Sequence, residues 1–138
     1  MRARYRTAAF NTDGGDGVSR VPGGLEVAVA SPLSDAADSD ATNPEQLLAL
    51  AWATCLNATA QVIVGGARRT AVRVEVALHD ARPGPGLEFH VDAYLSAEGA
   101  GVAEVERVLA AAHARCPVSK LLAGAATVRV HTEDYAAA

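Results

Sequence analysis

Hydrophobic and polar residues alternate along several segments in the pattern of half-buried strands. The alternation is strict at 72–78, Val-Arg-Val-Glu-Val-Ala-Leu, and a similar pattern at 87–95 follows a turn rich in proline and glycine at 82–86. A period of two places one strand face on a core and the other in solvent, so these segments are predicted to form a hairpin. Further strands are expected at 5–10, 25–29 and 125–132.

A long helix is predicted over residues 44–64. Asn43 can serve as its N-cap, Pro44 suits the first helical position, and Gln46 completes a pattern like a capping box. Gly65-Gly66 marks its end. Because the segment is apolar on nearly every side, we expect it to be buried on most of its faces.

Residues 101–115 have the spacing of an amphipathic helix, and Pro117 both ends it and can open a short helix at 118–122. No repeat, linker or second domain is evident, so we expect a single domain over residues 1–138. Strands and helices are segregated, and the turns between strands are of hairpin length. This order favours an α+β fold with largely antiparallel sheets.

Composition narrows the class of protein. Half of the 138 residues are hydrophobic but only 4% are aromatic, so the core must consist of Ala, Val and Leu, which makes oligomerisation a reasonable expectation. The net charge of −4, without a basic run, argues against a nucleic-acid partner. Residues 1–6 lack the apolar segment of a secretory signal, and polar residues interrupt the apolar region at 47–64. We therefore expect a cytoplasmic protein without a membrane partner.

The two cysteines are the best candidates for chemistry. Cys116 precedes a proline that can start a helix, a position where free N–H groups favour the thiolate. Cys55 lies in the middle of the long helix. Either residue taken alone is better explained as a structural side chain without chemistry. The two together, as the only thiols of the sequence, make redox chemistry the leading hypothesis among several. Paired ligand spacings typical of zinc are missing from the sequence, and we expect neither a metal nor a bound cofactor.

Two segments together resemble the OsmC/Ohr family of organic hydroperoxide reductases. They are residues 43–55, which begin Asn-Pro-Glu-Gln-Leu and end Ala-Thr-Cys, and residues 112–119, Ala-His-Ala-Arg-Cys-Pro-Val-Ser. They occur in the family's order, with the strand pair between them, and the resemblance covers essentially the whole chain. It implies an intertwined homodimer in which antiparallel sheets wrap around long central helices, with active sites at the subunit interface.

The resemblance also implies a cysteine-based peroxidase that protects against oxidative stress. Cys55 would attack an organic hydroperoxide and become a sulfenic acid. Cys116 would then react with this sulfenic acid to form a redox-active disulfide within the same chain. Glu45 matches the glutamate that holds an arginine beside the reactive sulfur. The reductant would be an external dithiol, of the lipoyl type usual in the family. We expect Trp52 and Leu56 to form an apolar substrate pocket beside Cys55.

Helix geometry restricts how Glu45 and Cys55 can meet. The ten residues between them correspond to roughly 15 Å along one helix, and at ~100° per residue their side chains point in different directions. Glu45 therefore cannot reach the Cys55 of its own helix. A site that uses both must bring together two chains or a folded-back segment, which agrees with an interfacial site.

The sequence departs from the family at the arginine. Ohr members carry it in a Gly-Gly-Arg-like loop after the first strand, where this chain has Gly15, and the OsmC branch takes it from the loop that corresponds to residues 31–41, which contains none. Arg20 is the nearest substitute in sequence, although it could equally be an exposed loop charge. Two alternatives to a peroxidase follow: a divergent redox sensor or apolar-ligand binder, and a structural dimer whose cysteines are core residues.

Overall fold

The computed structural model describes residues 2–34 and 40–136, in two compact units, Met1–Leu47 and Leu48–Ala138. The acidic part of the expected loop at 31–41 falls largely outside the described residues. The first unit contains a three-stranded antiparallel sheet of β1 (Phe10–Asn11), β2 (Gly17–Arg20) and β3 (Glu26–Val29) in that order. β3 confirms the strand predicted at 25–29.

The strand predicted at 5–10 is wrong except at its last residue. Residues 5–9 are exposed and carry no strand assignment, because only Phe10 and Asn11 find a partner strand. That partner, β2, was not predicted, since Gly-Val-Ser-Arg holds one apolar residue and shows no period. Pairing with β3 stabilises β2, a contact that local sequence does not reveal.

Helix α1 spans Pro44–Val64, as predicted. The Asn43 side-chain oxygen accepts a hydrogen bond from the Gln46 N–H at 2.8 Å, which confirms the N-cap. The Gln46 side chain accepts from the Thr42 hydroxyl at 2.9 Å, so the return bond of the capping box goes to a side chain. Gly65 adopts a positive φ of 62° just after the helix, where a side chain would be strained.

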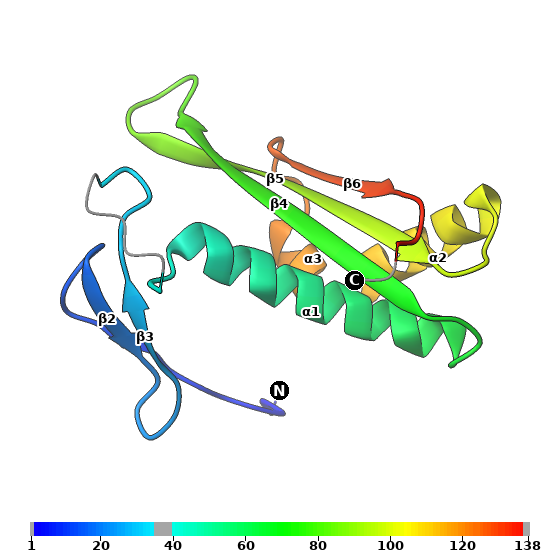
Figure 1. Cartoon of the computed structure of the whole chain (residues 1–138), viewed down its shortest axis with the longest axis horizontal. Coiled ribbons are helices and arrows are strands. Elements are labelled where there is room, and N and C mark those ends of the chain that lie inside the picture. The colour runs from blue at the N-terminus through cyan, green and yellow to red at the C-terminus, as the bar shows by residue number, and fades with distance from the viewer. Residues whose placement is uncertain (1, 35–39, 137–138) are drawn as a thin grey trace. The chain divides into compact units, whose positions relative to one another are not determined.

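The second unit contains a three-stranded sheet and the helices that cover it (Figure 1). β4 (Thr70–Asp80) and β5 (Leu87–Ala97) form the predicted antiparallel hairpin. Helices α2 (Val102–Arg115) and α3 (Pro117–Leu122) then carry the chain back, so that β6 (Val128–Thr132) pairs with β5 in parallel. The apolar face of this sheet and the helices form one core, whose buried residues from β5 and α2 are Val91, Ala93, Leu95, Ala97, Val105, Val108, Leu109 and Ala112.

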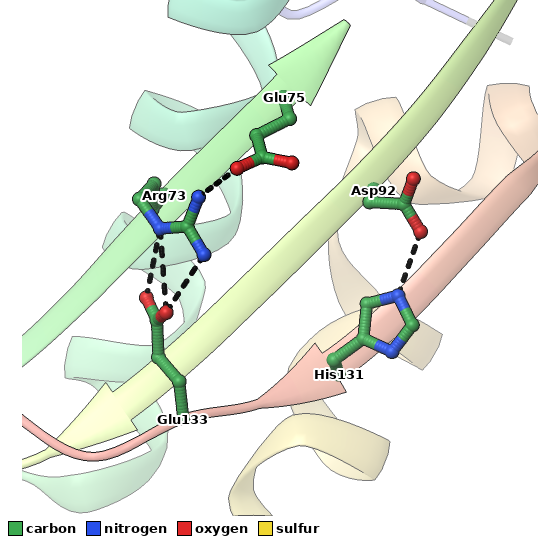
Figure 2. Close-up of polar contacts among 5 residues, drawn as sticks. All are labelled: Arg73, Glu75, Asp92, His131 and Glu133. Atoms are coloured by element: carbon green, nitrogen blue, oxygen red, sulfur yellow. Dashed lines mark hydrogen bonds and ion pairs between the residues drawn. The ribbon is translucent and has the colours of Figure 1, made fainter.

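The opposite face of this sheet is polar, as Figure 2 shows. Arg73 on β4 forms ion pairs with Glu75 and with Glu133, the latter at 2.9 Å. On β6, His131 bonds Asp92 of β5 at 2.7 Å. The His131–Asp92 contact joins the neighbouring strands β6 and β5, whereas Arg73 bonds within β4 and to the residue that follows β6. Every partner is half-buried or exposed, so this face is a solvated surface.

Helix α1 is less buried within the chain than its composition predicts. Of its 21 residues, all described, Trp52, Leu56 and Ala60 are buried, which is a single stripe at a spacing of four. Leu50 and Val62 are 63% and 66% exposed. The expectation of burial on most faces is therefore wrong for the single chain. By length and composition α1 could cross a bilayer, a test that core helices of soluble proteins also pass.

Candidate functional site

The two cysteines lie side by side in the second unit, although 61 residues separate them in sequence. Their sulfur atoms are 3.3 Å apart, and both are free thiols. Cys55 comes from α1 and is half-buried, whereas Cys116 lies between α2 and α3 and is fully buried. A disulfide bond is near 2.05 Å long, so the two sulfur atoms are in non-bonded contact.

The local sequence fixes the position of Cys116. It ends α2, where its N–H donates to the Ala112 carbonyl at 2.8 Å, and it is also the N-cap of α3. Pro117 makes this double role possible, because it cannot continue α2 but suits the first position of a new helix. As N-cap, the Cys116 sulfur accepts a hydrogen bond from the Ser119 N–H at 3.5 Å. This bond holds the sulfur at the start of α3, where it contacts the sulfur of Cys55 on α1.

The two thiols differ in the ease with which they ionise. Burial alone would raise the pKa of Cys116, but hydrogen bonds from the Ser119 N–H and hydroxyl, from Cys55 and from the Val118 N–H together lower it. Burial also raises the pKa of Cys55; the Val118 N–H opposes this, and the contact with Cys116 adds to it. Within the second unit, negative charge is therefore favoured on Cys116.

A buried hydrogen bond ties the helix that carries Cys55 to the segment that carries Cys116. The Trp52 indole N–H donates to the Ser119 hydroxyl oxygen at 2.9 Å, and both side chains are fully buried. Reasoning from sequence missed Ser119. The sequence did contain a signal for Ser119, because it lies three residues after Cys116. The side chain of an N-cap residue accepts a hydrogen bond from the N–H at that position.

The prediction that Trp52 and Leu56 form a substrate pocket beside Cys55 is wrong. Trp52 and Leu56 are fully buried in the core of the second unit, so their side chains have no surface left to contact a peroxide. Their periodicity indicated an apolar face but not the partner that covers it. This face packs against β5 and α2 of the same chain.

Glu45 and Arg20, the other two predicted site residues, belong to the first unit. Glu45 lies in the first turn of α1, and because α1 is one continuous helix, its separation of roughly 15 Å from Cys55 stands. Its Oε2 atom is buried and has no hydrogen-bond partner among the described residues. Arg20 is exposed at the end of β2, opposite Glu26 and Phe10. Its role near Cys55 stays a prediction.

Metal binding finds no support in the part of the chain that the structure describes. No three His, Cys, Asp or Glu side chains there are grouped closely enough to hold an ion. His79 and His90 lie with ring centroids 4.4 Å apart on the polar sheet face, and His113 lies 6.4 Å from Trp52.

Known proteins with similar sequences include organic hydroperoxide resistance proteins. Residues 37–131 match the family model described as OsmC-like protein. An organic hydroperoxide resistance protein-like protein of Mycoplasma pneumoniae is 36% identical over 129 residues, which cover 88% of this chain and 89% of that protein. The organic hydroperoxide resistance protein OhrA of Bacillus subtilis is 33% identical over 105 residues, which cover 72% and 74%.

A solved structure with a similar name matches the fold of this chain. The crystal structure of an organic hydroperoxide resistance protein, OsmC, from Legionella pneumophila superposes on this chain with a TM-score of 0.84 at 27% identity. The match covers 98% of this chain and 100% of that one. The predicted α+β fold of the OsmC/Ohr type is thereby confirmed.

Proposed function

The chain belongs to the OsmC-like protein family, and we propose that it is a thiol peroxidase that reduces organic hydroperoxides to alcohols. The observation that carries this proposal is the 3.3 Å distance between the sulfur atoms of Cys55 and Cys116, the cysteines of the two family motifs. Relatives named as organic hydroperoxide resistance proteins supply the substrate class. Once a peroxide has oxidised one of two thiols in contact, the other can attack it to form a disulfide.

The reaction needs no prosthetic group. The Cys55 thiolate attacks the terminal oxygen of the hydroperoxide, the O–O bond breaks, and the alkoxide leaves and is protonated to the alcohol. The Cys55 sulfenic acid is then attacked by the Cys116 thiolate, which forms the disulfide and releases hydroxide, protonated to water. An external dithiol, of the lipoyl type by analogy with the family, returns both cysteines to thiols.

Positive charge from outside the second unit would stabilise the Cys55 thiolate, because burial and the contact with Cys116 raise the pKa of this thiol. We assign this role to Arg20, held by Glu45. The buried Oε2 atom of Glu45 has no hydrogen-bond partner among the described residues, and a guanidinium would satisfy it. Because Glu45 cannot reach the Cys55 of its own helix, the assignment fits a site shared by two chains.

A homodimer also accounts for the exposed apolar residues of α1. Leu50 and Val62 would be covered by a second copy of the chain, as in an intertwined dimer built around central helices. We place the dimer in the cytoplasm, where the reducing environment keeps a resting thiol pair free.

The experiment that tests the function compares two single substitutions. Cys55→Ser removes the nucleophile and should abolish reduction of cumene hydroperoxide. Cys116→Ser removes the resolving thiol and should stop the reaction at a Cys55 sulfenic acid, which a sulfenic-acid trap and mass spectrometry would identify. Full turnover by Cys55→Ser would overturn the assignment.

The missing family arginine favours one alternative, a divergent redox sensor or apolar-ligand binder. Gly15 stands where Ohr members carry the arginine, so the thiolate has lost that support. Oxidation of the wild-type protein no faster than that of free cysteine, and without preference for organic peroxides, would favour this second candidate.

A further inference from the structure

We propose that Cys55 and Cys116 form a binding site for one trivalent arsenic centre, arsenous acid or an organic arsenical, that bridges the two sulfur atoms. The site follows from the geometry of the thiol pair and goes beyond the proposed peroxidase. Its effect on activity rests on the proposed function, because an arsenical bound here holds both thiols that the peroxide must oxidise. It is therefore an inhibitor of the reduced protein.

The distance between the two sulfur atoms selects the geometry of the atom that can bridge them. Thiol sulfur binds soft, thiophilic elements, and the bond from sulfur to an ion such as zinc is ~2.3 Å long. Two such bonds at the tetrahedral angle place the sulfur atoms ~3.8 Å apart. At the observed 3.3 Å, the same two bonds enclose an angle of about 92°. The pair therefore favours a centre whose bonds meet near a right angle over a tetrahedral ion.

Trivalent arsenic has this geometry. Its lone pair presses its three bonds together into a pyramid, in which the angles are close to a right angle. Its bonds to sulfur are about as long as those of zinc, since the two elements belong to the same row of the periodic table. Two of the three bonds go to the cysteines, and the third keeps the hydroxyl or organic group of the free arsenical.

The number of available ligands also favours such a centre. A structural zinc ion takes four ligands from the protein. Within residues 2–34 and 40–136, no three His, Cys, Asp or Glu side chains are grouped closely enough to hold a metal ion. An arsenical that brings its own third substituent needs two protein ligands, which is the number of cysteines in the sequence.

The surrounding fold holds the two sulfur atoms at this spacing. The indole N–H of Trp52 donates to the Ser119 hydroxyl oxygen at 2.9 Å, and both side chains are fully buried. Trp52 lies three residues before Cys55 on α1. Ser119 lies three residues after Cys116, so this bond joins the two segments that carry the cysteines. Because the thiols are already in place, binding one atom between them costs little conformational entropy.

The two thiols differ in exposure, which sets the order in which the bonds form. Cys55 is half-buried, whereas Cys116 is fully buried. The arsenical therefore meets Cys55 first, and Cys116 forms the second bond from the protected side. Water and competing thiols have little access to that second bond, which stabilises the bridged product.

The bonds form by exchange, without transfer of electrons. As each arsenic–sulfur bond forms, one hydroxyl group leaves arsenic and takes the proton of the thiol. The reaction of one arsenical with both cysteines therefore releases two molecules of water. Arsenic stays trivalent and both sulfur atoms stay at the oxidation level of a thiol, so the reaction requires the reduced pair and no other reactant.

The test is intact mass spectrometry of the reduced full-length protein with phenylarsine oxide, which hydrates in water to phenylarsonous acid. The wild type should bind one arsenic per chain with loss of two water molecules, and competition with glutathione gives its affinity. Cys55→Ser and Cys116→Ser should each bind about 100-fold more weakly or less, because the second bond is no longer formed within one molecule. Zinc chloride at the same concentration should not displace the arsenical, and displacement would overturn the selection by angle.

Cys55→Ser combined with Thr59→Cys is the matched control, since it keeps two thiols in each chain. Position 59 lies one turn further along α1, about 6 Å along the axis, so the thiols are no longer in contact. This variant should bind as weakly as the single-cysteine variants. Affinity equal to that of the wild type, in this variant or in either single substitution, would overturn the proposal.

Binding and peroxide reduction are measured separately, so the two proposals can fail independently. Bridged binding by a wild type that does not reduce cumene hydroperoxide would overturn the peroxidase and leave the site. Peroxide reduction by a wild type that binds the arsenical no more tightly than Cys116→Ser would overturn the site and leave the peroxidase. Arsenical added before the peroxide should prevent the Cys55–Cys116 disulfide, and its formation at the normal rate would also overturn the site.

Discussion

Replacing Leu50 with aspartate should dissociate the proposed dimer. Leu50 lies on α1 with 63% of its surface exposed in the single chain, beside a helix face that is apolar but uncovered. In a dimer built around the central helices this side chain would be buried against the second copy. A carboxylate at the same position would lose that burial and would bring an unpaired charge into the interface.

The size of the effect follows from the exposed surface. Full burial of a leucine side chain contributes about 1.5–3 kcal/mol, and 63% of that is about 1–2 kcal/mol for each chain. A two-fold interface contains the residue twice, so the loss is about 2–4 kcal/mol before any cost of the charge. Since 1.4 kcal/mol corresponds to a factor of ten, the dissociation constant should rise by roughly 30-fold to 700-fold.

Sedimentation equilibrium over a range of protein concentrations would measure this change. Val102→Asp is the matched control, because Val102 is 70% exposed but lies at the start of α2, where a carboxylate suits the first helical turn. The control should remain a dimer. If Leu50→Asp associates as strongly as the wild type, or if the wild type is a monomer at all concentrations, the reasoning from the exposed face of α1 is refuted.

Three further predictions concern the site. Trp52→Phe should lower the free energy of unfolding by about 1–3 kcal/mol in urea, because the buried Ser119 hydroxyl loses its donor; an unchanged value would mean that the bond contributes nothing. The pKa of Cys116 is lowered in the folded protein, so the reduced wild type should gain stability relative to Cys116→Ala as the pH rises from that lowered pKa toward about 8.5, the pKa of an unfolded thiol. A stability difference that does not change with pH would contradict this. Above that pH, the raised pKa of Cys55 acts in the opposite direction. Arg20→Ala should slow oxidation of Cys55 in the reduced dimer, whereas Arg129→Ala, which removes an exposed arginine of β6, should not; equal rates in both variants would remove Arg20 from the site.

Much of the second unit could be predicted from sequence because its signals are local. The capping residues around Asn43 and the glycines after Val64 fixed both ends of α1, and strict alternation located β4 and β5 to within two residues at each end. The parallel pairing of β6 was beyond reach, since it depends on the length and direction of the crossover through α2 and α3. β2 was missed because its stability comes from its neighbouring strands.

For the candidate site too, the sequence identified individual residues but not the contacts between them. Cys55 and Cys116 could be singled out by motif, and Cys116 by its place before Pro117, but their 3.3 Å contact is a property of the packed fold. The same packing turned Trp52 away from any substrate and toward Ser119, which no pattern of hydrophobic residues indicates. The apolar sequence of α1 predicted burial without stating whether the same chain or a second copy provides it.

The most direct test of the central claim is stopped-flow oxidation of the reduced protein, followed through Trp52 fluorescence, with cumene hydroperoxide and hydrogen peroxide in separate runs. Trp52 is the single tryptophan of the chain and lies next to the cysteine pair, so its emission should report the change of state. We predict fast oxidation that prefers the organic peroxide and ends in a Cys55–Cys116 disulfide, identified by mass spectrometry. Slow oxidation without such preference, or a product that lacks this disulfide, would contradict the account.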